Sequence, residues 1–267
     1  MEKAQKIDLI IKRDNTININ QSIECQEIKA DTSLFASLQS LLKKNGKLYY
    51  LLLKLFAPVL SSFSYYKTIK RLLKVYGQEH IILNIGSGPT YFNNRKDIIN
   101  VDIYKYDEVD VVADIMALPI EDEKIDFIIN IAMLEHVDKA NAAVREMFRI
   151  LKPGGEIFSY VPFIVPFHGA PQDFHRWTIL GIEKLFAKFE ILKIGIGAGP
   201  TSGMLWIFQE WLAILLSFGS KILHDIILMV LMVLTMPLKF IDMILVKFPH
   251  AEKIASGFYI VAEKKKE

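Results

Sequence analysis

From residue 79 onward the chain alternates short apolar runs with amphipathic segments. Seven runs rich in Ile, Val, Phe and Tyr have the character of buried strands, at residues 80–86, 97–103, 109–115, 125–132, 155–163, 189–197 and 257–264. Between the fourth and fifth runs, KANAAVREMFRIL has apolar residues at helical spacing and stops at KPGG, where proline and glycine end a helix. This alternation predicts an α/β domain with a parallel sheet covered by helices on both faces.

The pattern divides the chain into a domain and two additions. The domain is expected to comprise residues 79–203 and 249–267. Residues 1–78 form an N-terminal extension, in which we expect an irregular or weakly stranded arm over residues 1–32. Residues 34–74 then predict two apolar, lysine-dotted helices that are separated by a proline.

A hydrophobic helical insertion, residues 204–248, precedes the last strand. Its longest uninterrupted apolar run, residues 226–238, has thirteen residues, short of the roughly 20 that cross a bilayer. We expect a pair of helices that is either buried in the domain or attached reversibly to the cytoplasmic leaflet, with Trp206 and Trp211 at the interface. A packing surface within the molecule or between two copies is the alternative.

Composition narrows the class of partner. The formal net charge of +2 gives no bulk electrostatic attraction for nucleic acid. The single cysteine, Cys25, excludes an internal disulfide and a cysteine-based metal cluster, and the first twenty residues lack a continuous apolar signal core. We therefore expect a cytoplasmic protein that can lie peripherally on the inner face of the membrane.

Polar groups follow the first three predicted strands, where an open parallel sheet binds its ligands. LNIGSGPTYF ends the first strand in a tight Gly86-Ser87-Gly88 turn, which suits close approach of a nucleotide-like cofactor. Asp102 ends the second strand, sixteen positions after Gly86, where an acid reaches a ribose diol, and Asp114 follows the third and suits an adenine amino group. Each feature alone is compatible with an ordinary turn or helix cap.

Dinucleotides and S-adenosylmethionine are the two cofactor classes that use such a turn. The turn lacks the third small residue that a dinucleotide fold needs for close helix packing, which disfavours a dinucleotide. Residues 81–163 resemble a class I S-adenosylmethionine-dependent methyltransferase of the type 11 group, on the motifs ILNIGSGP, NVDI, ADIMALPIEDEKIDFIINIAMLEHV and RILKPGGEIF. Two positions depart from that family, which usually has an acidic residue at Asn84 and often a further glycine at Thr90.

The resemblance implies a Rossmann-like class I methyltransferase fold, with a seven-stranded, mostly parallel sheet and helices on both faces. It also implies S-adenosyl-L-methionine as the cofactor. The implied cofactor-binding residues are Asn84, Gly86, Ser87, Gly88, Asp102, Ile103, Asp114, Ile115 and Asn130.

The acceptor side of the site is expected in PFIVPFHGAPQDFHRWT, residues 162–178, which follows the fifth strand. His168 and Asp173 are the candidates for removing a proton from an acceptor, with His136 a further candidate. His175 and Arg176 are expected to bind substrate, although Asp173 and Arg176 could instead pair to hold the loop. The spacing within this loop fits no metal-ligand pattern, so we expect no metal.

The whole-length pattern, including GPTSGMLWIFQEWLAILLSFG, resembles bacterial methyltransferases of envelope polysaccharide functions. It implies O-methylation of a sugar or lipid-linked glycan at the cytoplasmic membrane face. Methylation of a membrane-soluble small molecule such as a quinone is one alternative. A cofactor-binding scaffold with little turnover, suggested by Asn84, is another.

Overall fold

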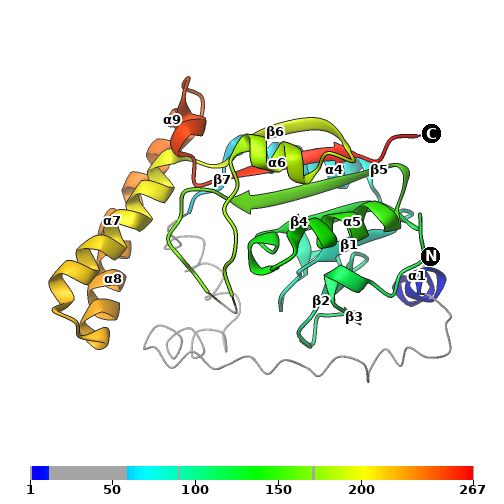
Figure 1. The fold of residues 1–267 in the computed structure, drawn as a ribbon, viewed down its shortest axis with the longest axis horizontal. Helices are drawn as coiled ribbons and strands as arrows, with labels where there is room; N and C mark the ends of the chain where they lie inside the picture. Colours follow the sequence, from blue (N-terminus) through cyan, green and yellow to red (C-terminus); the bar gives the residue numbers. More distant parts are fainter. Residues whose placement is uncertain (1, 12–58, 90, 170–171, 267) are drawn as a thin grey trace.

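The computed structural model describes residues 2–11, 59–89, 91–169 and 172–266, arranged around one twisted sheet (Figure 1). The seven strands lie in the order β3-β2-β1-β4-β5-β7-β6, and β7 alone runs in the direction opposite to the other six. Their bounds are Ile82–Ile85 (β1), Ile99–Asp102 (β2), Val111–Val112 (β3), Ile125–Ile131 (β4), Leu151–Pro162 (β5), Glu190–Ala198 (β6) and Gly257–Glu263 (β7). All seven predicted strands are present, which confirms the Rossmann-like fold expected from the sequence.

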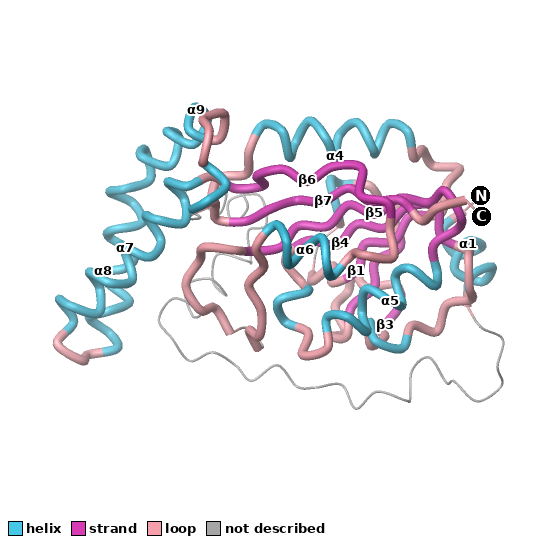
Figure 2. The backbone as a smooth tube through the Cα atoms, turned by 45° about the horizontal axis from the view of Figure 1, so that its top comes forward, coloured by secondary structure: helices cyan, strands magenta, loops and turns pink. Residues whose placement is uncertain are grey.

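Helices cover both faces of the sheet (Figure 2). The α-helices are Lys3–Ile10 (α1), Phe63–Val75 (α4), Ala140–Ile150 (α5), Ile179–Leu185 (α6), Pro200–Ser217 (α7), Lys221–Thr235 (α8) and Asp242–Leu245 (α9). Helix α4 packs on one face, where Leu72 joins Phe127 and Phe158 of the sheet. Helices α5 and α6 pack on the other, where Met147 and Ile182 join Leu83. The core therefore forms two layers, one on each face of the sheet, because successive side chains along a strand point to opposite faces.

Short 3₁₀ segments complete the connections. They are Phe92–Asn94 (η1), Ile115–Ala117 (η2), Leu134–His136 (η3), Met236–Ile241 (η4) and Ala251–Ile254 (η5). Segments η2 and η3 follow β3 and β4 at the carboxyl edge of the sheet, so they lie where the sequence predicts the ligand site.

The N-terminal extension contributes helix to the domain. Residues 3–10 form helix α1 and not the irregular arm expected from the sequence, because the Glu2 and Gln5 side chains make a reciprocal capping box. Lys6 is buried and donates its ammonium hydrogens to backbone carbonyls at Gln78 and His80. The second predicted helix is confirmed as α4, which begins after Ser62. The first lies outside the described residues.

Helices α7 and α8 form a hairpin that projects away from the sheet (Figure 1). The chain turns between them at Phe218 and Gly219, which both have left-handed backbone conformations. None of the residues of α8, all of which the structure describes, is buried. The insertion before the last strand is thus present, but it is not the buried helix pair considered as one expectation.

Polar side chains of the insertion are turned inward, between its helices. The Gln209 amide donates to the Thr235 hydroxyl at 2.6 Å, and His224 lies 3.3 Å from Glu210. Asp242 is buried and caps the start of α7 by accepting hydrogen bonds from both backbone N–H groups at its first turn and from the Ser202 hydroxyl.

Apolar side chains cover the outside of the same hairpin. They include Ile207, Trp211, Ile214, Leu215, Phe218, Ile222, Val230, Val233 and Leu234, and Phe218 at the tip is 90% exposed. Among the described residues one helical stretch, Lys221–Leu245, is long and apolar enough to cross a membrane, and only 11% of its apolar window is buried. The uninterrupted apolar run of thirteen residues underestimates the length of this apolar helical stretch. Lys239 and Asp242 interrupt the run in the sequence, but their side chains are buried.

Candidate functional site

The turn after β1 is shaped to receive a ligand against its backbone. Gly86 and Gly88 have φ values of +72° and +57°, a region that glycine adopts without strain. A Cβ atom at Gly86 would lie 2.3 Å from the Met133 side chain, so no larger residue fits there. A Cβ at Gly88 would meet no atom of the described chain within 4 Å, which leaves that side of the turn open.

Of the two aspartates expected to hold the nucleoside, Asp102 lies beside this turn and Asp114 follows β3 at the same edge of the sheet. Asp102 accepts hydrogen bonds from the Gly88 N–H at 2.8 Å and from the Tyr104 N–H at 3.0 Å. Asp114 accepts from the Met116 N–H at 2.8 Å and caps η2. Each carboxylate is half-buried and retains lone pairs for further donors, so both fit the hydroxyl and amino groups of an adenine nucleoside.

Two asparagines from the expected cofactor set serve the sheet. The buried Asn84 amide donates to the Asn100 side chain at 3.1 Å and so joins β1 to β2. The Asn130 amide donates to the Ile85 carbonyl at 3.0 Å and accepts from the Ser159 hydroxyl at 3.1 Å. Their side chains are therefore engaged inside the protein, in contrast to the expectation from the motif.

The other expected cofactor residues divide between the core and the open edge. Ile115 belongs to the hydrophobic core, while the neighbouring Met116 is exposed and is the side chain available to a flat base. Ser87 bonds locally to the Gly88 carbonyl, and Ile103 is half-buried just beyond β2.

A buried carboxylate, which sequence reasoning missed, lies next to the glycine turn. After β4 the backbone turns sharply at Ala132, with φ of 50°, into η3. This turn buries Glu135 completely, and neither of its side-chain oxygens has a hydrogen-bond partner among the described residues. A buried, unsatisfied carboxylate costs several kcal/mol or more, so it calls for a functional explanation.

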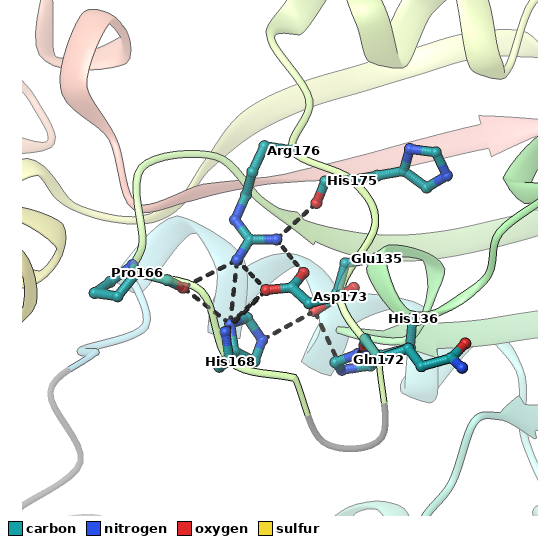
Figure 3. Close-up of polar contacts among 8 residues, drawn as sticks. All are labelled: Glu135, His136, Pro166, His168, Gln172, Asp173, His175 and Arg176. Atoms are coloured by element: carbon teal, nitrogen blue, oxygen red, sulfur yellow. Dashed lines mark hydrogen bonds and ion pairs between the residues drawn. The ribbon is translucent and has the colours of Figure 1, made fainter. Parts of the chain in front are cut away.

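Two histidines lie close to this carboxylate (Figure 3). The Nε2 atoms of His136 and His168 lie 4.0 and 3.8 Å from Glu135 Oε1. His136 is the last residue of η3. The negative carboxylate raises the pKa of His168 above the usual histidine value. We call these three residues the Glu135 cluster.

Asp173 and Arg176 hold the loop that carries His168. The guanidinium of Arg176 donates to both oxygens of Asp173, and Asp173 also accepts the His168 backbone N–H at 2.9 Å. These donors hold the pKa of Asp173 at about 2. A carboxylate that is already paired and so weakly basic is a poor proton acceptor, so Asp173 acts as a positioning residue here.

The expected substrate-binding pair also serves the loop. Arg176 donates further hydrogen bonds to the Pro166 carbonyl at 3.0 Å and the His175 carbonyl at 2.7 Å. The His175 ring donates to the Asp138 carbonyl at 3.0 Å and points away from the Glu135 cluster (Figure 3). Sequence spacing alone could not separate His175 from His168, because loop conformation decides which ring faces the site.

An apolar groove of about 370 Å³ opens at the base of the hairpin, beside the same loop. Its walls come from the loop, α7 and η5, and are Ile164, Met204, Ile207, Phe208, Trp211 and Ile254. The ring centroids of Trp206 and His168 are 5.7 Å apart, so the hairpin and the Glu135 cluster are in contact.

Comparison with known proteins identifies the chemistry of this edge. Residues 89–159, which include Asp102, Asp114 and η3, match the family described as a methyltransferase domain. This chain is an S-adenosylmethionine-dependent methyltransferase. No curated protein sequence matches it significantly.

Several solved structures with a similar chain trace are described as methyltransferases. A Haemonchus contortus phosphoethanolamine N-methyltransferase 2, solved with phosphomonomethylethanolamine and S-adenosylhomocysteine, is 15% identical, with a TM-score of 0.45 and coverage of 75% of this chain and 53% of that one. A methyltransferase from Methanosarcina mazei is 14% identical, with a TM-score of 0.45 and coverage of 75% and 98%. A possible histamine N-methyltransferase from Thermotoga maritima is 15% identical, with a TM-score of 0.44 and coverage of 85% and 100%. Strand order and direction, rather than these similarities, define the fold of this methyltransferase.

Proposed function

We propose that this methyltransferase methylates a hydroxyl group of a sugar, carried by a lipid-linked glycan at the cytoplasmic face of a membrane. The observation that carries the proposal is the Glu135 cluster, which lies one short turn from the glycine loop. Met133 connects the two, since it packs against Gly86 and its carbonyl accepts the His136 N–H at 2.9 Å.

The cluster suits a hydroxyl acceptor. The cofactor supplies, when bound, a methyl group on a positively charged sulfur. In the transfer a C–O bond forms, the C–S bond breaks with its electrons staying on sulfur, and the hydroxyl must release its proton. Glu135 and the two imidazoles present a carboxylate and two ring nitrogens that favour that release.

The apolar groove supports an acceptor that carries a hydrocarbon chain. It is continuous with the acceptor loop through Ile164 and with the hairpin through Met204 and Trp211. A lipid chain in this groove would bury apolar surface on both partners, at about 25 cal/mol per Å². A soluble sugar would leave the groove open to water.

The hairpin supports attachment to the membrane. Its exposed outer side chains are apolar while its polar side chains pair inside, an arrangement that suits lipid better than water. Helices α7 and α8 have 18 and 15 residues, so they extend about 27 and 22 Å at 1.5 Å per residue, close to the thickness of a bilayer's apolar core. The single cysteine suits the reducing, cytoplasmic side.

The two alternatives make different use of the same site. A quinone or another membrane-soluble phenol would also enter from lipid, but it needs no room for a polar sugar. A scaffold with little turnover was suggested by Asn84, but that side chain is occupied by Asn100, so its identity says little about catalysis.

The decisive experiment supplies detergent-solubilised protein with methyl-labelled S-adenosylmethionine and three separate acceptor pools. These are extracted lipid-linked glycans, demethylated quinones and soluble sugars. We expect label in the glycan lipids as an ether that survives mild alkali, and loss of that label in Glu135→Gln. Label confined to quinones would replace the proposal with the first alternative, and cofactor binding without transfer to any pool would favour the scaffold.

A further inference from the structure

The hydrogen bonds around the two histidines fix which ring nitrogen carries the proton. His136 Nδ1 contacts the Gln172 carbonyl, which can only accept, so this nitrogen donates. His168 Nδ1 lies 3.2 Å from the Pro166 carbonyl. Both hydrogens of Arg176 Nη2 are already donated, to the Pro166 carbonyl and to Asp173, so Nη2 has none left for His168 Nδ1. His168 therefore also carries its proton on Nδ1.

Because Nδ1 is the donor in both rings, the lone pair of each neutral ring lies on Nε2, the nitrogen that faces the carboxylate. Three potential ligand groups converge on one point, because one nitrogen of each ring and a Glu135 oxygen lie within 4.8 Å of one another, and both Nε2 atoms lie within 4.0 Å of Glu135 Oε1. Glu135 is completely buried, so water does not screen this arrangement as it would at a surface. A positive charge between the three groups would remove the electrostatic repulsion between the carboxylate and the two nitrogen lone pairs.

We propose that Glu135, His136 and His168 bind a divalent transition-metal cation. Two histidine nitrogens and one carboxylate on one side of an ion are the donor set of catalytic Zn²⁺ and of related Mn²⁺, Fe²⁺ and Co²⁺ sites. Metal-bound histidines usually donate their other N–H to a carbonyl, as both rings do here. Ligand atoms around such an ion lie roughly 3 to 3.5 Å apart, so the observed separations need only small side-chain rotations.

This inference rests on the proposed function where it concerns the acceptor. Three protein ligands leave coordination positions open, and a sugar hydroxyl, or two neighbouring hydroxyls, can occupy them. A coordinated hydroxyl has a lowered pKa and releases its proton to water, as metal-bound water does. The histidines then act as ligands and do not themselves take the proton.

The earlier expectation that no metal binds considered only the loop of residues 162–178. That loop supplies a single ligand, His168, and the other two come from the LEH sequence after β4. The set forms only when hydrogen bonds tie the loop to η3, such as that from the Phe174 N–H to the Glu135 carbonyl at 2.7 Å.

The test is cation binding by tag-free, chelator-treated protein. Co²⁺ is the probe, because its visible absorption reports coordination by nitrogen and oxygen, and Zn²⁺ competes for the same site in calorimetry. We expect one Co²⁺ per chain, displaced by Zn²⁺. Glu135→Gln and His168→Ala should each weaken binding by at least about 100-fold, since even supporting residues of metal sites account for 10- to 100-fold.

His175→Ala is the matched control, because this histidine lies in the same loop but points away from the cluster. It should bind Co²⁺ like the unmodified protein. S-adenosylhomocysteine binding and thermal melting show that each variant is folded. The proposal is wrong if the unmodified protein binds no Co²⁺ at millimolar concentration, or if Glu135→Gln and His168→Ala bind it as well as the control. If the cation binds but no acceptor is methylated, the metal site stands and the proposed function fails.

Discussion

At the scale of single residues, the structure divides the polar groups of the carboxyl edge by what they contact. Asp102 and Asp114 are half-buried and accept backbone N–H groups at the carboxyl edge, whereas the Asn84 side chain is buried and bonds to Asn100 inside the sheet. Sequence spacing anticipated that both aspartates follow strands at one edge of the sheet, because parallel strands end at one edge; their contact with the cofactor stays a prediction. It missed Glu135, because nothing in the spacing shows that a sharp turn buries that carboxylate without a partner.

Asp102→Ala should weaken cofactor binding. The carboxylate would lose its hydrogen bonds to the bound nucleoside, which are worth about 1.5 to 3 kcal/mol, or roughly tenfold or more in affinity. Calorimetry with S-adenosylhomocysteine measures the change. Because Asp102 also accepts the Gly88 and Tyr104 N–H groups, Asp102→Asn is the control that keeps an acceptor for them. Unchanged affinity in Asp102→Ala would exclude this residue from the cofactor site.

Asp173→Asn should destabilise the acceptor loop without weakening cofactor binding. It leaves the Arg176 guanidinium without its buried partner, at a cost of about 3 kcal/mol, and so lowers the melting temperature by roughly 6 to 12 °C. Glu121→Gln breaks the ion pair to Lys124, which has the same spacing but is exposed, and should cost less than about 1 kcal/mol. Equal melting temperatures for the two variants would show that the Asp173 pair does not hold the loop.

At the scale of elements, the insertion departs most from expectation. Its charged and polar residues were evidence against a membrane segment when counted along the sequence. In three dimensions Gln209 and Glu210 of α7 pair with Thr235 and His224 of α8, so much of the hairpin exterior is apolar. The geometry of the hairpin decides which face of each helix packs against the other helix. The number of polar residues that interrupt the apolar sequence does not show which face that is.

Replacing outer residues of α8 should release the protein from membranes. The triple variant Ile222→Ser, Val230→Ser and Leu234→Ser removes exposed apolar side chains, of which Leu234 is 69% exposed. Each substitution removes roughly 1.5 to 3 kcal/mol of the favourable free energy of transferring the side chain from water to lipid. We expect folding and cofactor affinity to stay unchanged. Fractionation of cells into membrane and soluble pools measures the shift.

The control changes equally exposed apolar residues elsewhere on the domain. Phe63→Ser, Val75→Ser and Leu180→Ser lie on α4 and α6 and should not alter the membrane fraction. A soluble dimer of the unmodified protein in buffer without detergent would assign the apolar surface to contact between two copies instead.

At the scale of the whole molecule, the alternating order of strands and helices can be predicted from local sequence patterns. The packing of the hairpin against the acceptor loop cannot be predicted in that way. Seven apolar runs and one amphipathic helix defined the sheet, since strand period and turn residues are local properties. The contact between hairpin and acceptor loop is not local. Gly203 packs against the backbone of Ile164 in the loop and against Ser256 before β7, so three distant segments meet there.

Gly203→Ala should disturb this junction. A Cβ atom there would lie 2.4 Å from the Ile164 carbonyl oxygen, so backbone must move, at a cost of about 1 to 3 kcal/mol. We expect a lower melting temperature together with slower methyl transfer. Gly181→Ala in α6, whose Cβ would lie 3.4 Å from the Thr178 hydroxyl oxygen, should leave both unchanged. A Gly203→Ala protein with unaltered melting and rate would show that the hairpin and loop are independent.

If the acceptor is the lipid-linked glycan proposed above, the junction at Gly203 also has a consequence for which of its sugars receives the methyl group. The hairpin and the loop carrying His168 leave the same edge of the sheet and are packed together, so a lipid-embedded hairpin would hold the reacting centre at one fixed height above the membrane. The distance between the membrane surface and the active site would then determine which sugar, counted from the lipid end of the acceptor, reaches the methyl group. Glycans of different length would be methylated on the same sugar counted from the lipid, whatever lies at their far end.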